Sequence, residues 1–123
     1  MIKQFIEIKT DFEAIHNWPE CPFDDVNFLK YPHRHKIYVV VKIETSNDRQ
    51  IEFFQFKYFI DDFIEDLFGS NILKQFGRRS MEEICNMILT KVLIDYKLCD
   101  IIISASEDNQ VRGIVEYTTN HKV

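Results

Sequence analysis

The chain changes its hydrophobic period twice, and this change limits the folds that it can adopt. From Lys36 to Glu44 apolar and more polar residues alternate, as in a strand with one face buried. The residues of the apolar face are Ile37, Val39, Val41 and Ile43. From Phe56 to Leu67 the apolar residues instead recur every three or four positions, which predicts an amphipathic helix. A chain that contains both periods predicts an α+β fold.

The remaining segments extend this pattern on both sides. Ile2 to Ile8 alternates and predicts a first strand, and Gln50 to Phe54 is expected to pair back on the 36–44 strand as a hairpin arm. Ser80 with Glu83 three residues later forms a capping box that predicts the start of a second helix. The period returns to two in 99–105, and a polar turn leads into 111–118. The expected order is therefore ββααββ.

Length and composition predict one domain over residues 1–123. The chain is 46% apolar and 28% charged, and it has no apolar segment long enough to cross a membrane. The N-terminus lacks the apolar run of a secretory signal, and Cys21, Cys85 and Cys99 form no CxxC pair. We therefore expect a cytoplasmic protein with free thiols.

The charge pattern does not favour nucleic acid as a partner. The formal net charge is −5, and the basic residues are scattered along the sequence. A protein that binds duplex nucleic acid normally needs a concentrated basic surface to neutralise phosphates. We therefore expect no nucleic acid duplex and no membrane among its partners.

Three histidines form the strongest functional signal. His33 and His35 are two residues apart at the start of a predicted strand, so their side chains point to the same side. His16 follows the first predicted strand and can reach the same place from a neighbouring segment. Three neutral imidazoles with a fourth position left open are typical of catalytic zinc. The alternative is that the histidines are ordinary surface or core residues.

Several segments resemble the 6-pyruvoyl- and 6-carboxy-tetrahydropterin synthases. Phe12-Glu13-Ala14-Ile15-His16 is similar to their F-x-A-x-H opening, and Pro32 to Tyr38 resembles their L-H-G-H-x-Y element. Further along the chain, similar segments follow in the same order: Ile51 to Lys57 (V-x-D-F-x-x-L-K), Ser80 to Ile84 (P-T-x-E-N), Ser106-Glu107 (E-T) and Val115 to Tyr117 (A-E-Y). The resemblance covers nearly the whole chain.

The resemblance implies a tunnelling fold, a four-stranded antiparallel sheet with two helices on one face, assembled into a homo-oligomeric ring. It implies that zinc is held by His16, His33 and His35, and that a pterin or purine-like ligand is bound by Glu107, with Glu52 as a second substrate contact. A carboxylate can accept two parallel hydrogen bonds from the N–C–N edge of such a ring. The alternative for Glu107 is a solvated glutamate in a turn.

The chain also departs from the synthases. It has no cysteine in the four residues before His33, and the segment 69–79 contains neither the aspartate nor the histidine of their Asp-His pair. Cys21 lies in the loop between the histidines and is the candidate catalytic nucleophile or proton shuttle; the alternative is an unreactive thiol. Three classes stay open: a zinc-dependent lyase like the synthases, a protein that binds or sequesters a pterin, purine or nucleotide without turnover, and an assembly module in which the histidines only stabilise the fold.

Overall fold

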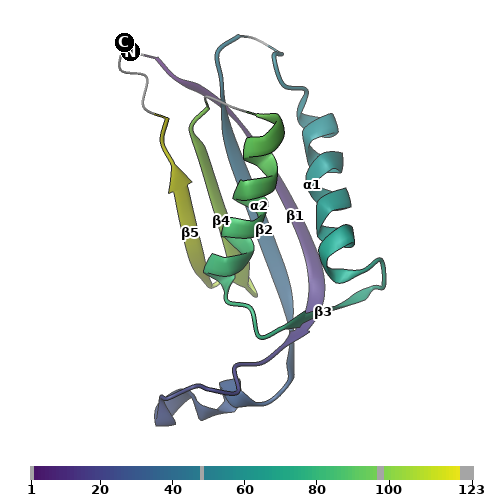
Figure 1. Ribbon diagram of the computed structural model, residues 1–123, viewed down its shortest axis with the longest axis vertical. Helices are drawn as coiled ribbons and strands as arrows, with labels where there is room; N and C mark the ends of the chain where they lie inside the picture. The colour runs from purple at the N-terminus through teal and green to yellow at the C-terminus, as the bar shows by residue number, and fades with distance from the viewer. Residues whose placement is uncertain (1, 48, 97–98, 120–123) are drawn as a thin grey trace.

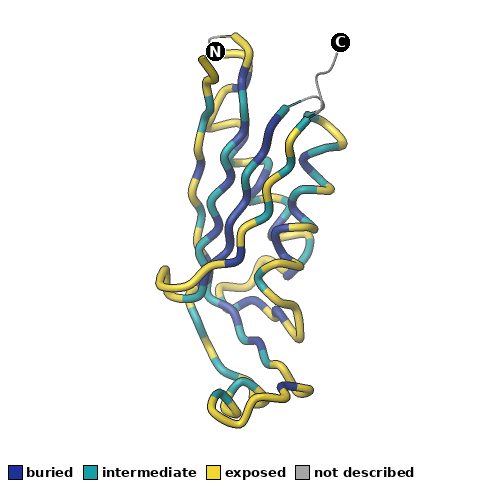
Figure 2. Tube along the Cα trace, turned by 90° about the vertical axis from the view of Figure 1, so that its left-hand side faces the viewer, coloured by how far each residue is buried: buried dark blue, intermediate teal, exposed yellow. Residues whose placement is uncertain are grey.

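One sheet carries two helices on the same side in this computed structural model, which describes residues 2–47, 49–96 and 99–119. The elements in chain order are β1 (Gln4–His16), the 3-10 segment η1 (Asp24–Lys30), β2 (His33–Thr45), α1 (Phe53–Phe68), β3 (Leu73–Gly77), α2 (Met81–Asp95), β4 (Ile101–Glu107) and β5 (Val111–Tyr117). The five strands are ordered β3-β1-β2-β4-β5 (Figure 1), and Figure 2 shows both helices on one side of them.

The two longest strands form the centre of the sheet. β1 and β2 have 13 residues each and pair antiparallel over their whole length, from Gln4 opposite Thr45 to His16 opposite His33. Their alternating pattern places Ile8, Phe12 and Ala14 on the helix side, together with the apolar face of β2. The connecting segment 17–32 extends beyond the end of the sheet, at the bottom of Figure 1. The connection therefore leaves the sheet after His16 and returns to it at His33, which lie opposite each other at the same end of the two strands.

The sheet differs from the expected four antiparallel strands, because it has a fifth strand that makes it mixed. β3 runs parallel to the end of β1, with Glu13 opposite Leu73. Its inward residues are Lys74 and Phe76, which are 7% and 0% exposed. Because Lys74 occupies a buried position, the strand lacks the alternating apolar pattern by which a strand is predicted. The Lys74 ammonium group donates to the carbonyl oxygen of Gly69, 2.5 Å away, at the end of α1.

The expected hairpin arm at Gln50 to Phe54 is also wrong. The chain turns after β2 and enters α1 at Phe53, and the side chain of Glu52 accepts a hydrogen bond from the Gln55 amide at 2.7 Å. Glu52 is thus the N-cap of α1, because an acceptor there satisfies a free N–H of the first turn. Phe53, the first residue of α1, is 52% exposed.

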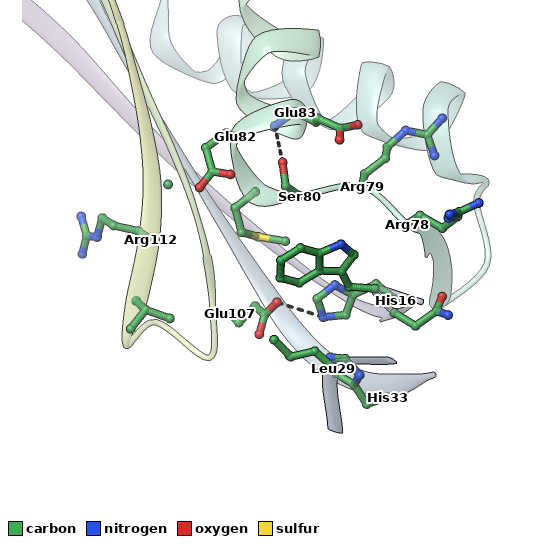
Figure 3. A pocket seen from close by; sticks show the side chains of 15 residues that line it. His16, Leu29, His33, Arg78, Arg79, Ser80, Glu82, Glu83, Glu107 and Arg112 are labelled. Atoms are coloured by element: carbon green, nitrogen blue, oxygen red, sulfur yellow. Dashed lines mark hydrogen bonds and ion pairs between the residues drawn. The ribbon is translucent and has the colours of Figure 1, made fainter. Parts of the chain in front are cut away.

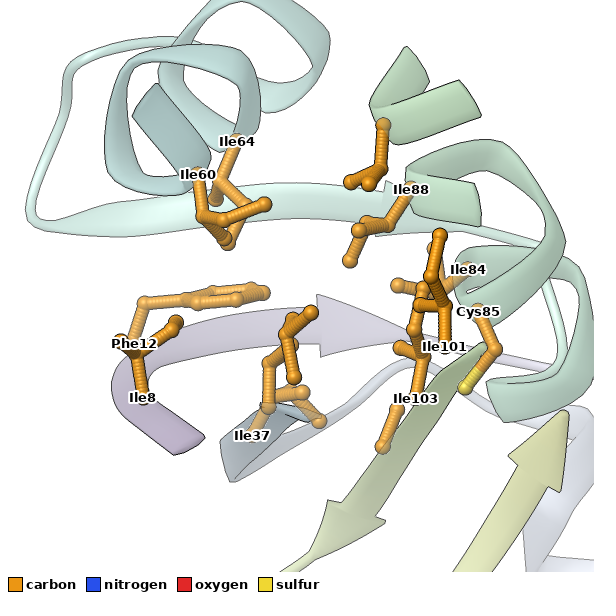
Figure 4. Close-up of a cluster of buried hydrophobic side chains, with 14 of the residues drawn as sticks. Ile8, Phe12, Ile37, Ile60, Ile64, Ile84, Cys85, Ile88, Ile101 and Ile103 are labelled. Atoms are coloured by element: carbon orange, nitrogen blue, oxygen red, sulfur yellow. The ribbon is translucent and has the colours of Figure 1, made fainter. Parts of the chain in front are cut away.

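The two helices cover different halves of the sheet. α1 packs on β1 and β3, and α2 packs on β4 and β5. They bury the residues Phe56, Ile60, Ile64, Phe68, Ile84, Cys85, Ile88 and Val92, several of which appear in Figure 4. Ser80 caps α2 as predicted, since its hydroxyl accepts from the Glu83 amide at 3.1 Å. Among the described residues, neither helix has the length and apolarity needed to cross a membrane.

An ionic contact joins the two ends of the described chain at the edge remote from the histidines. The Asp100 carboxylate accepts hydrogen bonds from the Lys3 ammonium and from the Thr119 amide and hydroxyl, the last two at 2.9 and 3.0 Å. These bonds, chiefly the one from Lys3, lower the pKa of Asp100 to about 2. The carboxylate therefore stays ionised in the folded protein down to strongly acid pH.

We expect Asp100→Asn to lower the melting temperature by several degrees at pH 7. The folded-state pKa of Asp100 lies below the ordinary aspartate value of 3.8, so the stabilisation is present above that value and is lost as pH falls toward about 2. The deficit should therefore shrink between pH 4 and pH 2 on this pKa. Asp62→Asn, an exposed change on α1, is the control. Thermal melts at these pH values test this, and a deficit independent of pH would contradict it.

Candidate metal centre and adjoining cavity

The pairing of β1 with β2 brings three histidines together. His16 ends β1 directly opposite His33, and His35 lies opposite Ala14. His33 and His35 share the face of Ile37 and Val39, so all three rings lie on the helix side of the sheet. The ring centroids are 4.4 Å apart for His16 and His33, 4.8 Å for His33 and His35, and 5.5 Å for His16 and His35. Strand register alone therefore produces the cluster that the spacing predicts.

Glu107 joins the histidines from the neighbouring strand. It ends β4 opposite Ile37, which places it diagonally beside His35. Its carboxylate oxygens lie 3.0 Å from His16 Nε2 and 3.6 Å from His35 Nε2. One potential ligand atom from each of these four residues lies within 4.8 Å of the others. The contact with His16 is the main cause that lowers the pKa of Glu107, so the site contains an ionised carboxylate.

Hydrogen bonds on the far side of two rings determine where their lone pairs point. His33 Nδ1 lies 2.7 Å from the carbonyl oxygen of Tyr31, which can only accept, so Nδ1 carries the hydrogen. His35 Nδ1 lies 2.6 Å from Oδ2 of Asp108, a carboxylate whose pKa is lowered chiefly by this same contact. In both rings the Nε2 lone pair is therefore free to bind a cation. Metal-bound histidines normally donate their other ring N–H to a carboxylate or a backbone carbonyl oxygen in this way.

Two buried ring nitrogen atoms make this cluster suitable for a metal ion. His16 Nε2 and His33 Nε2 are buried and form no hydrogen bond among the described residues, although His16 Nε2 lies 3.0 Å from a carboxylate oxygen of Glu107. A buried polar atom without a partner costs about 1–3 kcal/mol. Three imidazoles with one carboxylate are a donor set typical of zinc. Tetrahedral zinc separates its ligand atoms by roughly 3.3 Å, so small side-chain rotations would bring these residues to it.

A cavity of about 690 Å³ opens beside the cluster (Figure 3). His16, His33 and Glu107 form one wall, and the first turn of α2 from Ser80 to Glu83 forms another. Trp18 and Leu29 line it from the segment between β1 and β2. This volume lies in the range of small-molecule sites and suits a bicyclic ring.

Two predicted site residues are not brought to the cluster. Glu52 caps α1 after β2 has ended, and the 13 residues of β2 separate its end from His33 by roughly 40 Å. Cys21 is buried inside the 17–32 connection, where its thiol lies 3.8 Å from the carbonyl oxygens of Phe23 and Val26. It does not line the cavity.

The structure adds two site residues that the sequence did not single out. Trp18 lines the cavity two residues after His16, and Asp108 contacts His35. Asp108 follows Glu107 in a polar turn, where a carboxylate is common and carries no functional signal of its own. Its contact depends on the pairing of β2 with β4, which a single sequence does not reveal.

Comparison with solved structures identifies the fold. The chain resembles the structure of 6-pyruvoyl tetrahydropterin synthase from Plasmodium falciparum, with a TM-score of 0.69, 15% identity and coverage of 95% of this chain and 99% of that one. It also resembles an uncharacterized protein from Wolinella succinogenes, with a TM-score of 0.67, 14% identity and coverage of 94% and 98%. No family model matches the sequence, and no curated protein matches it significantly. At such low identity the likeness shows a fold of the 6-pyruvoyl tetrahydropterin synthase type.

We expect the untagged protein to bind one zinc ion per chain and to lose it when His33 and His35 are both changed to alanine. The reason is that only one imidazole and one carboxylate of the cluster would remain to hold the ion. The matched control is Arg34→Ala with Lys36→Ala, which alters the same strand on its other face. Elemental analysis after dialysis, with thermal melts before and after chelation, measures this. Zinc retained by the double-histidine variant would contradict the assignment.

Proposed function

We propose that the protein holds one zinc ion on His16, His33 and His35 and binds a flat nitrogen heterocycle of the pterin or purine type in the adjoining cavity. One observation carries this proposal: the two buried histidine nitrogens that form no hydrogen bond among the described residues belong to His16 and His33, which also line the cavity. A metal at this place would contact a ligand in the cavity. The fold shared with a 6-pyruvoyl tetrahydropterin synthase supports the choice of ligand class.

Glu107 is the proposed anchor of the ligand. Its side chain is 23% exposed and lines the cavity next to His16 and His33. A histidine nitrogen that directs its lone pair to a cation has no hydrogen to donate, so the carboxylate then keeps both oxygens for a ligand. Two parallel acceptors match the N–C–N donor edge of a pterin or guanine ring.

We propose binding, without rapid turnover, as the main activity. Bound zinc supplies a Lewis acid, but chemistry of the synthase type also requires a placed acid or base. Cys21, Asp24 and Asp25 are the nearby candidates in the 17–32 connection, and none of them lines the cavity. The thiol of Cys21 would have to leave its contacts with Phe23 and Val26 to reach a ligand.

Zinc-dependent lyase activity of the synthase type is the second candidate, and the fold favours it. In that case Cys21 is the proposed proton-transfer residue. The discriminating measurement is chromatography of the products from dihydroneopterin triphosphate, with wild type and Cys21→Ser compared at equal zinc content. Turnover that Cys21→Ser abolishes would replace the binding function by the enzymatic one.

We expect Glu107→Gln to weaken pterin or guanine-nucleotide binding by about 2–4 kcal/mol, roughly 30- to 800-fold, while zinc content is unchanged. The amide keeps the size of the side chain but replaces one acceptor by a donor. Trp18 is the only tryptophan of the chain and lines the cavity, so its fluorescence reports binding directly.

The matched control for this titration is Glu116→Gln, an exposed change on β5. Equal affinities of wild type and Glu107→Gln for the ligand would show that Glu107 does not bind it. Loss of zinc from Glu107→Gln would instead identify the carboxylate as a metal ligand.

We also propose that the chain forms a homo-oligomer through its sheet edges. β5 pairs only with β4, β3 pairs only with β1, and β1 pairs with β3 only from Glu13 onward, so β5, β3 and the first part of β1 have open edges among the described residues. Open edges offer free N–H and C=O groups to another chain. Ile114 on β5 is 58% exposed.

We expect light scattering to show an oligomer at micromolar concentration. Ile114→Lys should shift it toward the monomer, because an exposed lysine discourages edge pairing. Lys91→Ala, a change on α2 away from the open strand edges, is the control. A monomeric wild type would disprove the assembly and leave the metal site unaffected.

A further inference from the structure

Asp108 lies in the turn between β4 and β5 with an unusual backbone. Asp108 and Asn109 have φ angles of 53° and 60°, and the Gln110 amide donates to the Glu107 carbonyl oxygen at 3.2 Å. Left-handed conformations are costly for most side chains, and aspartate and asparagine are among the few that tolerate them. The Asp-Asn pair therefore makes a tight turn that returns the Asp108 side chain toward β2.

Three contacts fix Asp108 against β2. Its amide donates to the carbonyl oxygen of Lys36 at 2.8 Å, and its Oδ1 accepts from the Lys36 amide at 3.1 Å. The second carboxylate oxygen, Oδ2, lies 2.6 Å from Nδ1 of His35. The backbone and one oxygen thus hold the carboxylate in place while the other oxygen faces the imidazole.

We propose that Asp108 is a positioning residue that keeps the hydrogen of His35 on Nδ1 and directs the Nε2 lone pair to the metal. An ionised carboxylate can only accept, so the imidazole must present an N–H to it. A carboxylate behind a metal-bound histidine orients the ring and makes it a stronger ligand. This inference rests on the zinc site of the proposed function.

His35 is oriented by a side chain, the carboxylate of Asp108. His33 receives the same kind of support from a backbone carbonyl, that of Tyr31, which no substitution removes. Asp108 is therefore the side chain through which the orientation of a proposed ligand can be tested.

Two variants of Asp108 and one control distinguish its role in orienting His35 from its role in the backbone turn. Asp108→Gly removes the carboxylate, and glycine adopts a positive φ freely, so the turn is kept. Asp108→Asn keeps the size and one acceptor oxygen but removes the charge. Asn109→Gly changes the neighbouring left-handed residue and keeps the Asp108 carboxylate, so it is the matched control.

The first readout is the zinc dissociation constant from competition with a chelator. We expect Asp108→Gly to bind zinc 10- to 100-fold more weakly. Asp108→Asn should show a smaller loss, and Asn109→Gly should remain within about twofold of wild type. If Asp108→Gly does not fold, Asp108→Asn decides by the same comparison. Equal zinc affinities of wild type and the Asp108 variants would overturn the inference.

The second readout is the tautomer of His35 in metal-free protein, from the ¹⁵N shifts of its ring. Wild type should show the hydrogen on Nδ1, and Asp108→Gly should show a mixture; an unchanged tautomer would overturn the inference. A wild type that binds no zinc would disprove the proposed function, whereas this readout would still test the contact between Asp108 and His35. The two failures are therefore distinguishable.

Discussion

The register between β1 and β2 determines where the proposed functional side chains lie. Side chains alternate between the faces of a strand, so a slip of one residue would move a whole set of residues to the other face. The register is set by the core, because Ile8, Phe12 and Ala14 must face the helices together with the apolar residues of β2. The same pairing places His16 opposite His33. The apolar face of the sheet thus also positions the polar cluster at its end.

The cavity beside the cluster depends on how closely α2 approaches β5. A Cβ atom added to Gly113 would lie 2.9 Å from Glu82 Oε1 and 3.2 Å from the Glu82 backbone nitrogen. The first turn of α2 therefore packs directly on the backbone of β5, and its N-cap Ser80 is held at the cavity wall. A wall packed this closely on the sheet is consistent with the largely preformed sites in which small molecules usually bind.

The sequence revealed the parts of this arrangement that depend on local pattern. The spacing of His33 and His35 placed them on one face, and Ser80 with Glu83 marked the start of α2. The resemblance pointed to Glu107, but its distance from His16 depends on the pairing of β2 with β4, which local periodicity does not specify.

Three features of the structure could not be predicted from the sequence pattern, each for a physical reason. The run from Ile51 to Phe54 is apolar enough for a strand, yet the acceptor of Glu52 begins a helix there. The sequence does not show β3 as a strand because one of its inward residues is Lys74, whose ammonium group donates to the carbonyl oxygens of Gly69 and Asn71 after α1. Asp108 reads as an ordinary turn residue until the fold places it next to His35.

Anomalous X-ray diffraction at the zinc edge, from crystals of the zinc-loaded protein, would locate the metal directly. We expect one strong peak per chain, about 2.0–2.1 Å from a ring nitrogen of each of His16, His33 and His35. Either a fully loaded protein with its zinc bound elsewhere, or the absence of a peak between these three rings, would contradict this expectation.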